Sequence, residues 1–206
     1  NKGQVVIYFG TSIFVYTVAL TQDGKILLTG PISNKNGKQI ALIKLLSNGE
    51  FDSSFGRNGV VEQTIPQVNA GVDLKVLPGD KTLTGFYADG LKDYYQNCVI
   101  RYSAEGTVDS SFGSNGIILN RNPMNNVFPS MALNVRSNGK ILEYVKDTSY
   151  NLLLRYNADG SVDNTFGVHG RVQVASGTIF ENMSLSIDAN EKILVNIAPG
   201  FTIARY

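Results

Sequence analysis

Hydrophobic and polar residues alternate along this chain in short runs, separated by turns rich in glycine, asparagine and aspartate. The alternation is clearest before a recurring lysine, because the positions five and seven residues ahead of it are apolar in four successive segments. These pairs are Val18/Leu20, Leu74/Val76, Leu133/Val135 and Leu185/Ile187. A period of two predicts a β-strand with one buried face. The Asp-Gly, Pro-Gly, Asn-Gly and Asn-Glu pairs that follow predict tight hairpins into the next strand.

The recurring lysines are spaced 56, 59 and 52 residues apart, at Lys25, Lys81, Lys140 and Lys192. A period of this size indicates a propeller blade or a solenoid coil rather than independent domains. We therefore expect one all-β domain over residues 1–206, built from four repeats at about 1–57, 58–114, 115–168 and 169–206. The pattern within each repeat predicts four short strands. In the first repeat these are Gln4–Phe9, Tyr16–Leu20, Lys25–Thr29 and Gln39–Leu45.

A second motif, which we call the box, occurs three times after an apolar run. It consists of a glycine, an aspartate three residues later, and then Ser/Thr-Phe-Gly. Its members are Gly49, Asp52, Phe55 and Gly56; Gly106, Asp109, Phe112 and Gly113; and Gly160, Asp163, Phe166 and Gly167. We expect the first glycine to adopt a positive φ, the aspartate to accept backbone hydrogen bonds within the turn, and the phenylalanine to enter the core. Because the whole context is triplicated, we interpret the box as a structural repeat motif without catalytic residues.

Two sets of basic residues also recur. The lysines at the strand starts could form a charged ring, but the plainer interpretation leaves them solvated beside their turns. The second set is Lys44, Arg101, Arg155 and Arg205, each followed by Leu or Tyr. Since neighbours in a strand face opposite ways, we expect the aromatic residue inside and the basic residue outside, paired with an acid or facing a groove.

Few residues carry candidate chemistry. Cys98 matches apolar or small residues in the other repeats and is interpreted as a core filler. His169 matches Asn58 and Asn115, which predicts a turn position. Asn157, Asp159 and Asp163 are spaced as in a calcium loop, but the other copies do not keep this pattern. We therefore predict no metal site and no cofactor. Tyr87, Tyr94, Tyr95 and Tyr150 are assigned to loops, where they would serve recognition or anchoring.

Composition narrows the function classes. The net charge of +1 over 206 residues offers no basic stripe for nucleic acid. No stretch approaches the ~20 consecutive apolar residues of a membrane span. The sequence Asn1-Lys-Gly-Gln does not read as a signal peptide.

The sequence Arg155-Tyr-Asn-Ala-Asp-Gly-Ser-Val-Asp-Asn-Thr-Phe-Gly167, together with the Asp-Gly-Lys-Ile-Leu hairpin, resembles the delta-60 repeat of bacterial β-propeller-like proteins. The resemblance covers nearly the whole chain. It implies a β-propeller of four-stranded antiparallel blades in a secreted or surface-attached bacterial protein. It implies no catalytic residues. The fourth copy departs most, because it stops at Arg205-Tyr206 where its box would begin.

We expect a non-catalytic binding or scaffold module that recognises a protein, a glycan or copies of itself through its loops. The alternatives are a structural subunit of a surface assembly and a glycan-processing enzyme. The enzyme would need non-repeated acidic or histidine residues at one mouth, and we see no such asymmetry. For closure we favour a four-bladed ring in which Gln4–Phe9 pairs with Phe201–Tyr206. An arc of a larger propeller and an arc completed by another chain, associated through edge strands, are the alternatives.

Overall fold

The computed structural model describes residues 12–34, 37–65, 68–89, 94–123, 131–146, 150–176, 183–197 and 202–205. Within these ranges the chain forms four antiparallel sheets and one short 3₁₀ turn, η1 (Pro78–Asp80). No helix in this part of the chain is both long and apolar enough to cross a membrane. The predicted all-β class is confirmed.

The sheets follow the order of the chain, and each is a meander of consecutive strands. The first contains β1 (Ser12–Ile13), β2 (Thr17–Leu20), β3 (Ile26–Asn34), β4 (Gly37–Leu45) and β5 (Val60–Gln63). The second contains β6 (Val68–Val76), β7 (Thr82–Asp89), β8 (Tyr94–Tyr102) and β9 (Ile117–Pro123). The third contains β10 (Met131–Val135), β11 (Ile141–Lys146), β12 (Tyr150–Tyr156) and β13 (Arg171–Ser176). The fourth contains β14 (Leu185–Ile187), β15 (Ile193–Ile197) and β16 (Thr202–Arg205).

The first sheet is a four-stranded meander whose first strand is broken in two. β1 and β2 pair with successive parts of β3, and the amides of Phe14 and Tyr16 keep contact with β3 across the break. β3 carries Gly30 and Pro31 at this point. A Cβ on Gly30 would lie 1.7 Å from the Phe14 carbonyl oxygen, so only glycine admits the close approach. The break therefore behaves as a β-bulge.

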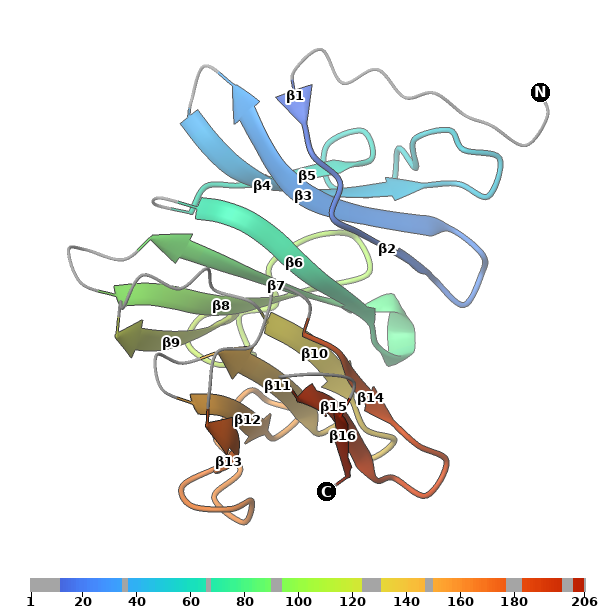
Figure 1. Cartoon of the computed structure of the whole chain (residues 1–206). Helices are drawn as coiled ribbons and strands as arrows, with labels where there is room; N and C mark the ends of the chain where they lie inside the picture. The colour runs from blue at the N-terminus through green and yellow to red at the C-terminus, as the bar shows by residue number, and fades with distance from the viewer. Residues whose placement is uncertain are drawn as a thin grey trace.

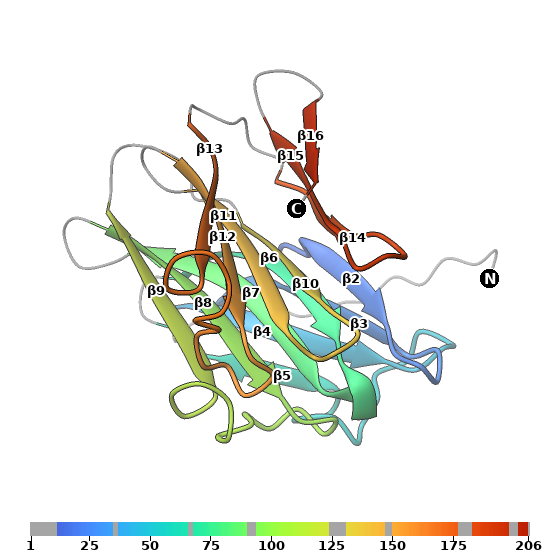
Figure 2. The same ribbon diagram turned by 90° about the horizontal axis from the view of Figure 1, so that it is seen from below.

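Consecutive sheets pack face to face, and the core lies between them (Figure 1, Figure 2). Each layer is filled by large apolar residues from two neighbouring sheets. They include Leu27, Leu42 and Leu74 between the first and second sheets, Leu83, Val99 and Leu133 between the second and third, and Leu142, Leu153 and Leu185 between the third and fourth. The first and fourth sheets lie at opposite ends of this array in Figure 1. The described sheets are thus not closed into the ring that we favoured, which agrees with either of the arcs that we kept as alternatives.

The sheet boundaries differ from the repeat boundaries. β5, β9 and β13 each begin a sequence repeat, yet each pairs with the last strand of the preceding repeat. The reason is local, because the box folds the chain back on itself and makes consecutive strands antiparallel neighbours. The predicted ladder from Gln4–Phe9 involves residues outside the described ranges. The tyrosines assigned to loops were placed wrongly, since Tyr87, Tyr94, Tyr95 and Tyr150 all belong to strands.

Candidate functional site

The box forms the same turn in all three copies. Gly49, Gly106 and Gly160 have φ angles of 89°, 86° and 86°, as predicted. In each copy the aspartate Oδ1 accepts hydrogen bonds from the backbone amide and the hydroxyl two residues on. The amide bonds measure 3.1 Å from Ser54 to Asp52, 3.2 Å from Ser111 to Asp109 and 3.1 Å from Thr165 to Asp163. The predicted turn-fixing hydrogen bond is confirmed.

The second carboxylate oxygen binds the recurring lysine. Lys25, Lys81 and Lys140 place Nζ at 3.1, 2.8 and 2.7 Å from Oδ2 of the box aspartate of their own sheet. In the second and third copies an arginine joins, with Arg101 Nε 2.9 Å from Asp109 and Arg155 Nε 2.7 Å from Asp163. The lysines are therefore not simply solvated beside their turns, as the sequence suggested, because the strand register aims each at a carboxylate.

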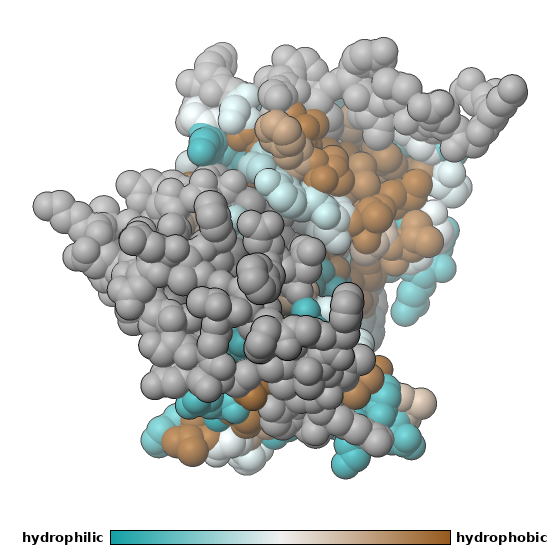
Figure 3. Space-filling view, viewed as in Figure 1, coloured by the Kyte–Doolittle hydropathy of each residue, from teal (hydrophilic) through white to brown (hydrophobic). Residues whose placement is uncertain are grey.

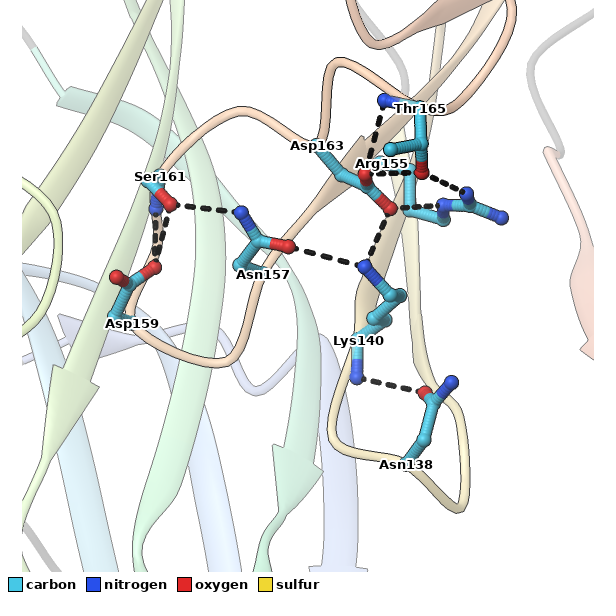
Figure 4. Close-up of polar contacts among 8 residues, drawn as sticks. All are labelled: Asn138, Lys140, Arg155, Asn157, Asp159, Ser161, Asp163 and Thr165. Carbon is cyan, nitrogen blue, oxygen red and sulfur yellow. Dashed lines mark hydrogen bonds and ion pairs between the residues drawn. The ribbon is translucent and has the colours of Figure 1, made fainter.

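The third copy shows this network most fully (Figure 4). Lys140 Nζ also donates to Asn157 Oδ1 at 3.0 Å, so the ammonium binds two of the three residues whose spacing resembles a calcium loop. The side chain of Asp163 is 3% exposed. Hydrogen bonds from Lys140 and then Thr165 hold the pKa of Asp163 well below its usual range. The carboxylate is therefore charged at neutral pH and fully engaged within the fold.

The three boxes contact one another in sequence order. The Gly56 amide donates to the Glu105 carbonyl at 2.8 Å, and the Gly113 amide donates to the Asp159 carbonyl at 2.7 Å. Arg101 Nη1 reaches the Ala158 carbonyl at 2.6 Å while its guanidinium lies 4.5 Å from the ring centroid of Phe112. Successive boxes therefore contact each other through backbone hydrogen bonds and through the packing of Gly106 on Phe55 and Gly160 on Phe112, whereas the cation–π contact lies within one box.

Gly160→Ala tests the contact between boxes. A Cβ at Gly160 would lie 2.7 Å from the Gly113 amide nitrogen and 2.9 Å from the Phe112 ring, at a positive φ. We expect a loss of about 2 kcal/mol in the free energy of unfolding, measured by urea denaturation. Gly24→Ala is the matched control, because Gly24 has a φ of 79° and a methyl group added there would meet nothing within 4 Å. It should cost about 1 kcal/mol; equal losses would contradict a role in packing.

The basic and aromatic residues of the box strand are both inside. Arg101 and Lys44 are buried, and so are Tyr102, Tyr156 and Leu45. The predicted pairing with an acid is confirmed for Arg101 and Arg155. The predicted outward position was wrong for Lys44 and Arg101, because each reaches a carbonyl of the following blade, which covers it. The phenylalanines differ among copies: Phe55 and Phe112 are buried, whereas Phe166 is half-buried.

The remaining candidate residues have structural surroundings. Cys98 is buried as predicted, and burial raises the pKa of its thiol to about 12. His169 has a φ of 50°, matching Asn58 and Asn115 at 52° and 53°, so it occupies the predicted turn position. Across the described ranges, no three histidine, cysteine, aspartate or glutamate side chains cluster in a way that could hold a metal.

Glu143 is a residue that the sequence pattern did not single out. Its carboxyl is fully buried between the second and third sheets, where it accepts hydrogen bonds of 2.8 Å from Tyr156 Oη and from Asn120 Nδ2. Its other oxygen has no hydrogen-bond partner among the described residues. The aligned repeats could have revealed Glu143. The position three residues after the recurring lysine holds Leu28, Thr84 and Val195 in the other repeats, so a carboxylate there is unusual. Glu143 is thus a non-repeated acid that the comparison of the repeats did not single out.

Glu143 should make stability depend on pH. Burial raises its pKa to about 7 from the 4.5 of a free glutamate. The unfolded chain therefore releases this proton before the folded chain does, and the contribution of Glu143 to stability falls as pH rises from 4.5 to 7. Glu143→Gln should remove that fall and be about 1–2 kcal/mol more stable than the parent at pH 8, after the cost of a buried amide without a partner. Parallel stability–pH curves for the two proteins would disprove the assignment.

Two segments of the chain, residues 21–55 and 136–166, match a family described as "Domain of unknown function (DUF5122) beta-propeller". Each segment runs from the hairpin turn before a recurring lysine to the phenylalanine of a box. The match supports a β-propeller family. The four sheets are accordingly blades, and the boxes are the turns that join the two outer strands of a blade. No curated protein matches the chain.

Proposed function

We propose that this propeller is a non-catalytic binding or scaffold module of the delta-60 type, in a bacterial protein that is secreted or held at the cell surface. Its ligand is a protein, a glycan or another copy of the chain. The carrying observation is a strip of exposed apolar side chains on the first blade, where Phe14, Tyr16, Val18 and Leu20 are each more than half exposed. A soluble domain rarely exposes such a strip without a binding role.

The fate of the charged residues supports the non-catalytic part of this proposal. The three recurring carboxylates are held by lysine, arginine and hydroxyl groups of their own blades. Glu143, the non-repeated acid, is 0% exposed and lies between blades. A general acid or base must reach its substrate within hydrogen-bond distance, whereas these carboxylates are bound by groups of the fold or buried within it.

Binding of the intact chain to a glycan array, with its mass in solution measured in parallel, tests the proposal. We expect either glycan retention or association, and the double variant Phe14→Ser/Tyr16→Ser should weaken whichever is seen. Turnover of a panel of chromogenic glycosides and esters would contradict it, above all if Glu143→Gln abolished the turnover.

A further inference from the structure

The exposed strip includes a position, that of Val18, which is buried in every other blade. Leu74, Leu133 and Leu185, seven residues before the recurring lysine, are 3%, 0% and 8% exposed because the preceding blade covers them. Their equivalent in the first blade, Val18, is 60% exposed. The same holds five residues before the lysine, where Leu20 is 66% exposed and its equivalents pack into the core.

The exposed surface follows the first strand of the blade, since Ile43 and Leu45 on the same side of β4 are buried. Phe14 and Tyr16, in the break between β1 and β2, extend it at 66% and 56% exposure. Figure 3 shows the hydrophobic colour gathered over the first blade, in the upper part of the view. We call Phe14, Tyr16, Val18 and Leu20 the entry face, since it is the side on which a preceding blade would lie.

The fourth blade carries the complementary half. Two residues after the recurring lysine, Leu27, Leu83 and Leu142 are each 0% exposed in the layer shared with the following blade. The fourth blade repeats this residue as Leu194, which is only half-buried. The side of the fourth blade that bears Leu194 is therefore built to carry another blade, and we call it the exit face.

We propose that the entry face of one chain binds the exit face of a second copy, which deepens the scaffold function proposed above and rests on it. Three layers of the same construction already hold the blades of one chain together. The first and fourth blades, which bear the two faces, lie at opposite ends of the array of described sheets (Figure 1). Such a head-to-tail contact is heterologous and propagates into rings or filaments.

The internal layers also supply the register of the contact. The first strands of neighbouring blades lie side by side, with the Leu133 amide donating to Asp73 Oδ2 at 2.6 Å and Asn134 Nδ2 donating to the Leu185 carbonyl at 3.3 Å. Asn134 lies six residues before its lysine and Leu185 seven before the next. The same relation places Ser186 of one copy beside Val18 of the other.

Mixing two single-cysteine variants tests the contact. Full-length Val18→Cys and Ser186→Cys chains, combined and mildly oxidised, should give a disulfide-linked dimer at several times the yield of either variant alone. Cys98 does not compete, because it is buried. No excess dimer in the mixture would overturn the proposal. So would a Val18→Cys/Ser186→Cys double variant that closes only as a monomer, since its own fourth blade would then fill the entry face.

Solution mass provides the second measurement. The parent should gain mass with concentration, whereas Val18→Glu/Leu20→Lys should stay monomeric with an unchanged melting temperature. Leu119→Glu/Val168→Lys is the matched control, because these residues are 58% and 72% exposed on other surfaces, and it should associate like the parent. A parent that stays monomeric yet binds glycans would refute this contact while leaving the binding function intact.

Discussion

Phe112→Ala is expected to destabilise the chain by about 4 kcal/mol, the largest effect that we expect from any single substitution. The ring is fully buried in the layer between the second and third blades, so truncation leaves a cavity. It also removes the surface on which the Arg101 guanidinium and the Gly160 backbone rest. Urea denaturation of parent and variant, followed by far-UV circular dichroism, measures the difference.

Phe166→Ala is the comparison that makes this result specific. Phe166 has the same place in the third box and a similar cation–π contact, with the Arg155 guanidinium 4.3 Å from its centroid, but the ring is half-buried. We expect about half the loss found at Phe112. If the two variants lost the same free energy, burial between blades would not be the cause.

The second large effect is expected at Asp163. Asp163→Ala should cost about 3 kcal/mol, because it leaves Lys140 and Arg155 facing each other without the carboxylate that separates them. It also frees the amide and hydroxyl of Thr165. Asp109→Ala should cost less, since the side chain of Lys81 is 44% exposed and that of Lys140 is 29% exposed. Thermal and urea unfolding of both variants gives the order.

The dependence on pH separates the charge of Asp163 from its shape. Its pKa lies below that of the unfolded chain, so its stabilising contribution is complete above about pH 4 and declines as pH falls towards the folded-state pKa. The deficit of Asp163→Ala should therefore be constant from about pH 5 to 8 and shrink below about pH 4. Asp163→Asn, which keeps most of the shape, should share this shrinkage. A deficit independent of pH would assign the effect to turn geometry alone.

Local features of the fold could be predicted from the sequence because they depend on a few neighbouring residues. The hydrogen bond from the Ser111 amide to Asp109 spans two residues, and the left-handed backbone at His169 follows from its match to Asn58 and Asn115. The alternation around Val18 and Leu20 correctly indicated a strand, but the burial expected of these two residues was wrong, because both are exposed. Cys98 was correctly predicted to be a core residue, because the equivalent positions of the other repeats hold apolar or small residues.

Features that depend on how blades meet were missed. Lys81 and Asp109 are 28 residues apart, and their pairing requires the strand register. Arg101 was expected outside, but the next blade covers it and supplies the Ala158 carbonyl as its partner. Glu143 was passed over because it sits in an apolar alternation, where a carboxyl is tolerated only through Asn120 and Tyr156 of neighbouring strands.

The offset between sequence repeats and blades has a consequence for folding. β5, β9 and β13 each begin one repeat but pair with the blade formed by the repeat before it, so each of the last three repeats contributes strands to two blades. If one repeat unfolded, the blade before it would lose its outer strand. The free energy of opening one repeat therefore includes contacts of the neighbouring blade. The stability of a repeat protein is approximately the sum of the intrinsic stabilities of its repeats and of the interfaces between neighbouring repeats. Strands shared between blades raise the interface part and lower the intrinsic part. The four repeats should therefore unfold in a single cooperative transition, since each is too small to fold independently.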